Sequence, residues 1–370
     1  MPLKSISSSL RTTLENMNVP EYADQFRIPF IIFCLTFTLF FLPREVRLSG
    51  ERIKVGEDLV LYLEERVGLD EMVPRLAELD ISFSEPELRW AANLYGLRNF
   101  NPGRYEISGS WSYYDLLYKL VMGLQDPALV TVLPGTTVER LAGSLGNQLR
   151  ADSSAFNAIF SDSSSLVNEL GTDPQTLFSR MLPDSYHMYW TSQPESVIRR
   201  IYGEFERRVA SEWQGEISNH PLDLDDLVTV ASIIEWEARF EDEKPRIGGL
   251  YLNRLNRRMR LQADPTVIYA IGEHRRLLYE DYNVDHPYNT YRISGLPPTP
   301  ITNPDLASIR AAIAPEEHDY LYMVASPDGG HVFNRTFEEH RLASNEWRRW
   351  IREQFRIRQE RERLQEEPES

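Results

Sequence analysis

The sequence has almost no cysteine and lacks the short motifs of several common enzyme classes. Cys34 is the single cysteine among 370 residues, so the remaining chain forms no disulfide, which is compatible with an exported domain. The chain also has no glycine-rich phosphate loop, no G-x-S-x-G turn and no H-E-x-x-H motif. Any catalytic chemistry must therefore use residues outside these motifs.

An excess of positive charge is also absent. The chain carries 40 Lys and Arg against 56 Asp and Glu, a formal net charge of -16. This balance argues against nucleic acid as a partner, because nucleic acid selects for basic protein faces. Hydrophobic residues make up 42% and charged residues 26%, as in an ordinary globular protein. The length allows two domains and additional segments.

The seven histidines are scattered and form no metal motif. His331 and His340 are the candidates for a metal site, but they have neither a cysteine partner nor paired spacing. We therefore expect no metal and no cofactor. The candidates that remain for catalysis and binding are carboxylates and amides, namely Glu235, Gln262, Asp264 and Asn289.

Residues 28–42, IPFIIFCLTFTLFFL, contain no ionisable charge. The stretch is short against the ~20 residues of a spanning helix, but apolar and basic neighbours extend it. These neighbours are Phe26, Val46, Arg27, Arg44 and Arg47. A cleaved signal peptide is the alternative, disfavoured by the acidic residues in the leading segment and by PREVR at the expected cleavage site. We expect a single transmembrane anchor over residues 28–43.

Residues 50–125 predict a small α/β unit. IKVG has strand character, DLVLYL resembles the start of a helix, and MVPRLAELDI and PELRWAANLYG have helical apolar spacing. NPGRYEISGS predicts a turn and a strand, and SYYDLLYKLVMG predicts a helix that ends at Gly123. Four aromatic residues either stack on sugar rings or belong to the core: Trp90, Tyr95, Tyr105 and Trp111.

Residues 126–343 predict a larger mixed α/β domain, so the fold class of the whole chain is α+β. ALVTVLPGTT predicts a strand, and TTVERLAGSL predicts a helix with Thr at its cap. The polar stretch Asp152–Asp173 is expected to lie between helices, and Met181–Trp190 to form a loop or extended segment. Residues 288–304 contain four prolines and cannot form a regular helix, whereas DYLYMVAS and PDGGHVF predict two strands.

The end of the chain predicts an amphipathic C-terminal helix and tail over residues 344–370. Arg and Glu alternate along most of this segment. The apolar stripe on the remaining face consists of Trp347, Trp350, Ile351 and Phe355.

The central candidate for catalysis is Glu235, on a predicted helix that is apolar nearly all round. A carboxyl group in such surroundings has a raised pKa and can serve as a general acid. Residues three and four apart share a helix face, which places Glu235 with Ala231, Ser232, Ala238 and Arg239. In the alternative, Glu235 faces solvent or pairs with Arg239, which would lower its pKa.

Two further carboxylates bear on this hypothesis. Glu237 is expected to point away from Glu235, toward the side of Val230, Ile233 and Ile234. A glycosidase with two carboxylates would need a partner for Glu235, and Asp264 is the first choice. The sequence Asp-Pro-Thr also fits the start of a helix at Pro265, so both interpretations of Asp264 stay open.

Four segments occur in a distinctive order and spacing: ASIIEWEA, YLNRLNRRMRLQADPTVIYA, PYNTYRISGLPPTPITNP and DYLYMVASPDGGHVFNRTFEEH. They resemble the YceG-like (MltG) family of endolytic murein transglycosylases over about residues 50–340. The resemblance implies a cytoplasmic segment over residues 1–27 and an inner-membrane anchor. It further implies a LysM-like subdomain over residues 50–125 and a catalytic domain outside the cytoplasm over residues 126–343.

The resemblance also implies a reaction. Glu235 falls on the family's catalytic Glu, acting first as acid and then as base to cleave the MurNAc–GlcNAc bond within nascent strands. The products would be 1,6-anhydro ends, and cleavage would end strand elongation. The implied substrate-binding residues are Gln262, Asp264, Thr266, Tyr288, Asn289 and Tyr291. The implied partners are peptidoglycan glycan strands, the inner membrane and peptidoglycan synthases (penicillin-binding proteins).

Two positions depart from the family pattern. Phe178 stands where many members have an acidic residue, and Pro134-Gly135 stands where many have P-E-G. The first departure removes a second carboxylate from that loop. Two other functions stay open. One is a hydrolytic muramidase in which Asp264 or another carboxylate positions a water, and the other is a non-catalytic glycan-binding anchor that recruits cell-wall synthesis enzymes.

Overall fold

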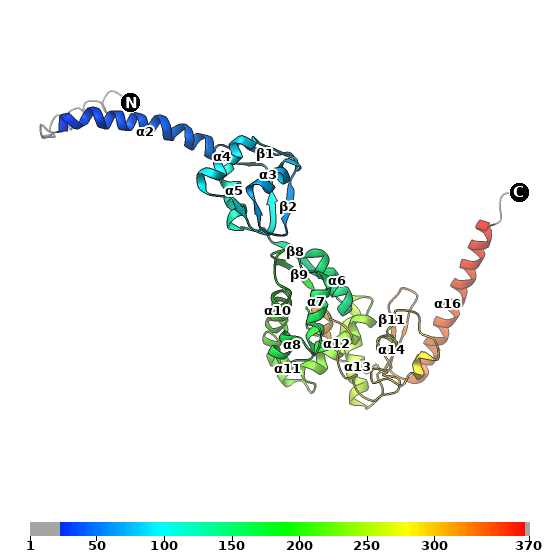
Figure 1. Ribbon diagram of the computed structural model, residues 1–370. Coiled ribbons are helices and arrows are strands. Elements are labelled where there is room, and N and C mark those ends of the chain that lie inside the picture. The colour runs from blue at the N-terminus through cyan, green and yellow to red at the C-terminus, as the bar shows by residue number, and fades with distance from the viewer. Residues whose placement is uncertain (1–22, 367–370) are drawn as a thin grey trace, which may run out of the picture. The chain divides into compact units, whose positions relative to one another are not determined.

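The chain folds into two compact units, each of which mixes helices with antiparallel strand pairs. The computed structural model describes residues 23–366, and the division between the units falls between Asp126 and Pro127. The prediction of a mixed α/β fold is confirmed (Figure 1). Most of the segment expected to be cytoplasmic, residues 1–22, lies outside the described residues.

The first described element is the apolar helix α2, Ala23–Ser49. Its stretch Ile28–Ser49 has a mean hydropathy of 1.6 and exposes most of its described apolar side chains, so by length and composition it is able to cross a membrane. A signal sequence meets the same criteria, so the anchor stays a prediction. The helix continues past the predicted boundary at residue 43, and Leu48 near its end is buried in the core of the first unit.

The first unit packs three helices against short antiparallel sheets. The strands are β1 Ile53–Val55, β2 Leu59–Leu63, β3 Val67–Gly68, β4 Ile81–Ser82, β5 Asn99–Phe100, β6 Gly103–Ile107 and β7 Ser110–Trp111. One sheet has the strand order β4-β1-β7, and the other two are the pairs β2-β6 and β3-β5. The helices are α3 Leu69–Ala77, α4 Glu85–Tyr95 and α5 Tyr113–Met122. As predicted, α5 ends at Gly123, whose φ of 68° is left-handed.

One segment of this unit differs in class from its prediction. DLVLYL, expected to start a helix, forms strand β2. Leu61 and Leu63 are buried while Val60 and Tyr62 are exposed, which is the two-residue alternation of a strand. The segment is a strand because all of β2 pairs with β6. The apolar stretch DLVLYL is too short to distinguish a helical period from a strand period.

The four aromatic residues considered for sugar stacking differ in exposure. Tyr105 is fully buried, so it belongs to the core. Trp90, Tyr95 and Trp111 keep part of their surface in solvent. The Nζ atom of Lys119 lies 5.2 Å from the ring centroid of Trp111, so Lys119 covers one face of the indole. Sugar contact therefore remains a prediction for the three partly exposed rings.

The second unit begins with an antiparallel strand pair, β8 Ala128–Val132 and β9 Asp184–Met188. Thr137 caps the first helix as predicted, because its hydroxyl accepts a hydrogen bond from the backbone N–H of Arg140. The elements that follow are α6 Val138–Gln148, α7 Ser153–Ile159, α8 Ser165–Leu170, α9 Pro174–Ser179, α10 Pro194–Phe205, a π-helical turn Glu206–Ser211 and α11 Gln214–Asn219.

The stretch Asp152–Asp173, expected to lie between helices, contains α7 and α8. The polar residues that pointed to a loop are caps. Asp152 and Ser164 accept hydrogen bonds from the backbone N–H groups of Ala155 and Val167, and both helices bury apolar residues behind these caps. The segment Met181–Trp190, expected to form a loop or extended segment, contains the extended strand β9, in agreement with that prediction.

Helix α12, Leu224–Glu237, runs through the core of the second unit, and every residue from Leu227 to Ile234 is buried, as its apolar sequence predicts. It packs against α13 Lys244–Asn256, α14 Asp264–Ile271 and α15 Leu306–Ile313, with 3₁₀ turns at Glu241–Glu243 and Asp281–Asn283. Helices α13 and α15 approach closely, since a Cβ atom on Gly248 would lie 2.3 Å from the carbonyl oxygen of Ala311.

Helix α12 ends at Glu237, whereas the predicted helix face around Glu235 includes Ala238 and Arg239. Ala238 has a ψ of 122° and leaves the helix, so Arg239 is not one turn beyond Glu235. The expectation that Glu235 shares a helix face with Ala238 and Arg239, and the alternative that pairs it with Arg239, are both wrong. Lys244 takes the place of Arg239 as the cation beside Glu235.

The chain ends in a hairpin and a long helix. Strand β10, Tyr322–Ala325, pairs with β11, His331–Asn334, as predicted for these two segments. Residues 288–304 form neither helix nor strand, in agreement with their four prolines.

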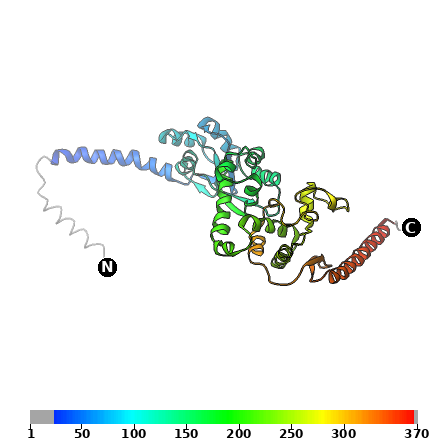
Figure 2. The ribbon, with the colours of Figure 1, turned by 90° about the horizontal axis from the view of Figure 1, so that it is seen from below.

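Helix α16, Phe337–Glu366, runs without a break in both views (Figure 1, Figure 2). It begins before residue 344, the predicted start, because Thr336 and Glu339 cap each other. The backbone N–H of Glu339 donates to the Thr336 hydroxyl at 3.2 Å, and the N–H of Thr336 donates to the Glu339 carboxylate at 3.1 Å.

Candidate active site

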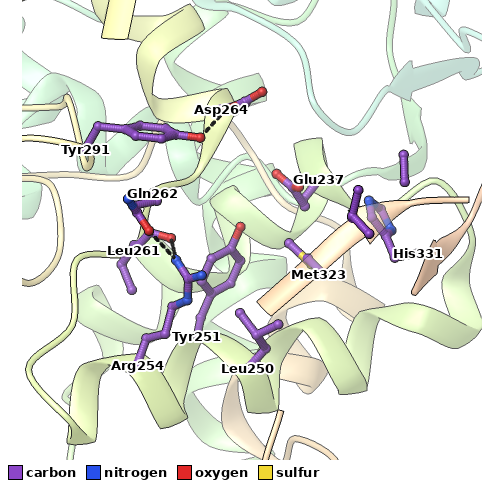
Figure 3. A pocket seen from close by; sticks show the side chains of 12 residues that line it. Glu237, Leu250, Tyr251, Arg254, Leu261, Gln262, Asp264, Tyr291, Met323 and His331 are labelled. Carbon is purple, nitrogen blue, oxygen red and sulfur yellow. Dashed lines mark hydrogen bonds between the residues drawn. The ribbon is translucent and has the colours of Figure 1, made fainter. Parts of the chain in front are cut away.

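A cavity of about 260 Å³ lies at the C-terminal end of α12 (Figure 3). Its walls come from α12, α13, the segment that leads into α14, the proline-rich loop and the β10–β11 hairpin. The lining residues are Glu237, Leu250, Tyr251, Arg254, Leu261, Gln262, Asp264, Tyr291, Met323, Val324, Ala325 and His331. The segments that carry the family motifs therefore meet around one concave site, the usual form of a ligand pocket.

The structure brings only part of the predicted site together. Gln262, Asp264 and Tyr291 line the cavity, whereas Glu235, Thr266, Tyr288 and Asn289 do not. The α12 carboxylate that faces the cavity is Glu237, which was expected to point away from the site (Figure 3). Glu237 does follow Val230 and Ile233 on one helix face, as expected, but it lies at the helix end, where that face emerges from the core into the cavity.

Glu237 is the titratable group best placed for proton transfer. Burial is the main influence that raises the pKa of Glu237 to about 7, and the Asp264 carboxylate acts in the same direction. Tyr251 and Arg254 act against this rise. Glu237 therefore carries a proton over part of the neutral range, which is the requirement for a general acid.

Asp264 is oriented by two tyrosines. The Tyr291 hydroxyl donates to Asp264 Oδ1 at 2.6 Å, and the Tyr282 hydroxyl donates to Oδ2 at 3.3 Å. Burial and the Asp264 carboxylate raise the pKa of Tyr282 to about 12, so this phenol remains a donor. With hydrogen bonds from two phenols, Asp264 is fixed beside Glu237.

Gln262 has a backbone conformation that is uncommon for a residue other than glycine. Its φ is 50°, in the left-handed region. The chain is held there by a hydrogen bond of 3.2 Å from the Gln262 N–H to the Thr290 carbonyl oxygen. Strain of this kind is found at sites where surrounding contacts impose it, often to aim a side chain. Here it directs the amide of Gln262 into the cavity.

Arg254 holds the segment of Leu261 and Gln262 in place through hydrogen bonds. Its guanidinium donates to the carbonyl oxygen of Leu261 at 2.6 Å, to that of Leu321 at 2.6 Å and to Gln262 Oε1 at 3.4 Å. The neighbouring Tyr251 hydroxyl is buried, and none of the described residues satisfies it at hydrogen-bond geometry, although it lies close enough to Glu237 to act on its pKa. A buried donor in this position is available to an oxygen of a bound ligand.

His331 and Glu243 form a pair at the hairpin wall. The Glu243 carboxylate accepts the His331 backbone N–H at 2.7 Å, and its second oxygen lies 3.0 Å from Nδ1 of the ring. The sequence singled out His331 only as a metal candidate. Among the described residues, no cluster of three His, Cys, Asp or Glu side chains is suited to a metal. The pair instead attaches the β11 wall to the start of α13.

Glu235 lies in a separate buried network. Its side chain is 9% exposed, and Oε2 accepts hydrogen bonds from Ser308 Oγ at 2.6 Å, from the Asp305 N–H at 3.1 Å and from Lys244 Nζ at 3.4 Å. Burial raises the pKa of Glu235. Burial also opposes ionisation of Asp305, but the hydrogen bond from Lys244 Nζ, at 2.6 Å, holds the pKa of Asp305 below its usual value. The network joins α12, α13 and α15.

The remaining predicted residues support the site from outside the cavity. Thr266 and Asn289 are fully buried. Thr266 Oγ1 lies 2.8 Å from Oγ1 of Thr290, and the Asn289 side chain donates to the carbonyl oxygens of Tyr282 and Val284 at 3.1 and 2.8 Å. These contacts fix the loop that carries Tyr291. The hydroxyl of Tyr288 hydrogen bonds to Thr299 within the proline-rich loop.

The raised pKa of Glu237 predicts a dependence of stability on pH. The folded state holds this proton more tightly than the unfolded chain, so the free energy of unfolding should fall as the pH rises from 4.5, the ordinary value, to about 7, and then level off. The loss should be about 3 kcal/mol. Thermal melts of the wild type and of Glu237→Gln at several pH values measure this loss. The stability of the variant relative to the wild type should rise between pH 4.5 and about 7 and stay constant outside this range. A stability difference independent of pH would contradict the assignment.

Comparison with known proteins supports the resemblance seen in the motifs. An endolytic murein transglycosylase of Bacillus subtilis is 29% identical over 289 residues, which are 74% of this chain and 80% of that protein. One of Streptococcus pneumoniae is 29% identical over 269 residues, 64% of this chain and 48% of that protein. The chain thus spans about half the length of the streptococcal relative.

The fold is also shared with a solved structure. A crystal structure of a YceG-like protein from Listeria monocytogenes superposes with a TM-score of 0.54 and 26% identity, and the match covers 78% of this chain and 99% of that chain. The sequence profile of the YceG-like family matches residues 61–346, well over half of the chain. The resemblance inferred from the motifs is confirmed, and the chain belongs to the YceG-like family.

Proposed function

We propose that this chain is an endolytic murein lytic transglycosylase and that Glu237 is its acid and base. One observation carries the proposal. A carboxyl group with a pKa of about 7 faces a cavity whose other polar groups, Gln262, Asp264 and Tyr291, come from the family motifs. The relatives named endolytic murein transglycosylases support murein as the substrate and lytic cleavage as the reaction.

In the proposed mechanism one carboxyl group serves both steps. Protonated Glu237 donates its proton to the oxygen that links MurNAc to GlcNAc, and the bond from the anomeric carbon to this oxygen breaks as positive charge develops on the ring. The Glu237 carboxylate then takes the proton of the six-position hydroxyl of the same muramic ring. The freed oxygen bonds to the anomeric carbon and closes the 1,6-anhydro ring. No water is consumed, and Glu237 ends protonated as it began.

The residues around Glu237 can stabilise the developing charge and hold the substrate in this mechanism. Asp264 favours the protonated form of Glu237, and its negative charge offers electrostatic stabilisation to the developing cation. Because both of its oxygens already accept hydrogen bonds from tyrosines, Asp264 is a poorer choice for activating a water. The Gln262 amide and the Tyr251 hydroxyl are placed to hold the sugar and its acetamido group.

Glu235, the catalytic residue predicted from the sequence, is the second candidate. Its carboxyl group also has a raised pKa, but the contacts from Ser308, Asp305 and Lys244 occupy it, and it does not line the cavity. A general acid has to reach the glycosidic oxygen within hydrogen-bond distance. The geometry therefore favours Glu237 as the acid and Glu235 as a residue that joins three helices.

The other parts of the chain complete the proposal. Helix α2 anchors the protein in the cytoplasmic membrane with the second unit outside the cytoplasm. The first unit is a LysM-like module that adds affinity for glycan through the partly exposed rings of Trp90, Tyr95 and Trp111. Cleavage of nascent strands near the membrane would end their elongation, beside the peptidoglycan synthases that make them.

The ends of the cleaved strands test the reaction. Uncross-linked glycan strands digested by the purified full-length protein should acquire non-reducing 1,6-anhydromuramyl ends, one for each bond broken, as measured by mass spectrometry. Reducing muramyl ends would show a hydrolytic muramidase instead. Intact strands that remain bound to the protein would show a glycan-binding anchor without catalysis.

A further inference from the structure

A second cavity lies next to the candidate active site and shares a wall with it. Its volume is about 440 Å³, and it is lined by Arg260, Tyr279, Tyr282, Asn283, Tyr291 and Arg292. Tyr291 lines both cavities, and Tyr282 hydrogen bonds to Asp264 of the first. The two cavities are therefore neighbours, and Tyr291 contributes to the wall of each.

Two arginines give this second cavity a positive charge. Neither Arg260 nor Arg292 forms an ion pair with any residue between 23 and 366, although the chain as a whole carries a formal net charge of -16. By contrast Arg275, in the same region, is paired with Glu273 and Asp281. Arg260 donates to the carbonyl oxygen of Tyr291 at 2.9 Å, which fixes it at the shared wall while leaving other N–H groups available.

Three tyrosines supply the rest of the lining. Tyr279 is 90% exposed, so its ring contributes nothing to the core. Tyr282 and Tyr291 meet edge to face with ring centroids 4.6 Å apart. Guanidinium groups bind carboxylates through paired hydrogen bonds, and tyrosine rings pack against the aliphatic parts of a peptide. The combination fits an elongated ligand that carries carboxylates.

We propose that this second cavity binds the stem peptide of the muramic acid residue being cleaved. This inference rests on the proposed function, because murein is the substrate that joins a sugar chain to carboxylate-bearing peptides. The peptide is attached to the same ring whose anomeric carbon lies beside Glu237. Its carboxylates therefore lie within reach of the residues around the first cavity, and Arg260 and Arg292 offer them a positively charged site on the other side of Tyr291. The cavity selects strands that still carry peptides.

The test compares two forms of one substrate. Uncross-linked strands with their stem peptides, and the same strands after an amidase has removed the peptides, are digested by the full-length protein. The wild type should cleave the peptide-bearing strands with the higher kcat/KM. In Arg260→Gln/Arg292→Gln this preference should fall by about tenfold, mainly through KM, since each exposed ion pair contributes up to about a fivefold change.

The control removes the same charge nearby. Arg257 and Arg258 are exposed, precede Arg260 closely in the chain and line neither cavity, so Arg257→Gln/Arg258→Gln should keep the preference of the wild type. Equal losses on both substrates, or no loss on either, would overturn the proposal. A loss that depends on a lipid pyrophosphate at the strand end, and not on peptides, would also overturn it and assign the arginines to phosphate.

Binding separates this inference from the proposed reaction. The affinity of fluorescently labelled strands for Glu237→Gln is measured with and without the arginine substitutions, under conditions in which no bond is cleaved. If the arginine substitutions weaken the binding of peptide-bearing strands but not of peptide-free strands, the second cavity binds the peptide, even if the wild type proves not to be a lytic enzyme. Equal binding of both strand types by both proteins rejects the cavity even if the lytic reaction is confirmed.

Discussion

Glu237→Gln is expected to lower the rate of strand cleavage by about 10²–10⁴-fold, with little effect on the affinity for strands. Gln has nearly the shape of Glu but cannot give and take a proton. Because one group serves both steps of the proposed mechanism, the loss should lie toward the upper end of this range. The measurement is the rate at which 1,6-anhydro ends appear under saturating substrate, with binding followed in parallel.

Glu235→Gln is the matched control for this experiment. It makes the same chemical change two residues away on the same helix, where the amide oxygen can still accept the hydrogen bonds from Ser308 and from the Asp305 N–H. We expect turnover within about tenfold of the wild type. The reverse pattern, with turnover lost in Glu235→Gln and kept in Glu237→Gln, would restore the residue predicted from the sequence and reject Glu237.

Lys244→Met should lower the free energy of unfolding by about 3–5 kcal/mol, a severe loss for a single substitution. The ammonium group lies 2.6 Å from Asp305 and 3.4 Å from Glu235, and the Lys244 side chain is only 6% exposed. Without it, two carboxyl groups face each other in a buried space with no cation. Urea denaturation followed by circular dichroism measures the loss, part of which should be recovered at low pH, where these carboxyls bind protons.

Arg246→Met provides the comparison for the lysine substitution. Arg246 lies on the same helix and pairs with Glu316, but both side chains are about 40% exposed. The loss should therefore stay below about 1 kcal/mol. Similar losses in the two variants would mean that Lys244 contributes no more than a surface ion pair does, and that the network around Glu235 is not what holds α12 to α15.

The sequence was sufficient to predict the buried helix α12 and the family, because both depend on local pattern. Apolar residues on every side predict burial wherever the helix is placed. The four motif segments also predict that distant parts of the chain meet, and Gln262, Asp264 and Tyr291 do meet in one cavity. These conclusions needed no knowledge of where any helix ends.

The choice between Glu235 and Glu237 did depend on where the helix ends. On a long helix, Glu237 would follow Val230 and Ile233 into the core. Because α12 stops at Glu237, that face opens into the cavity at its last residue, whereas Glu235 turns toward α15. Asp305, one of the partners of Glu235, lies seventy residues after it in the sequence, and no local sequence pattern predicts a contact over that separation.

Other differences have the same physical origin. Residues with small polar side chains between 152 and 173 are helix caps as well as loop formers, and only the apolar residues packed behind them distinguish the two. The left-handed backbone of Gln262 is imposed by Thr290, a residue of another motif. A conformation maintained by tertiary contacts leaves no signal in the local sequence.

The pair between Glu243 and His331 has a consequence for the time at which the enzyme becomes competent during synthesis. The hairpin that carries His331 forms the far wall of the cavity, and it is the last part of the lining to be made. Roughly ninety residues separate it from Glu237, which corresponds to about 5–20 s of translation at ordinary rates. During that interval the nascent chain carries its acid without an enclosed cleft around it. A ribosome-bound chain that ends before this hairpin should therefore be inert toward murein.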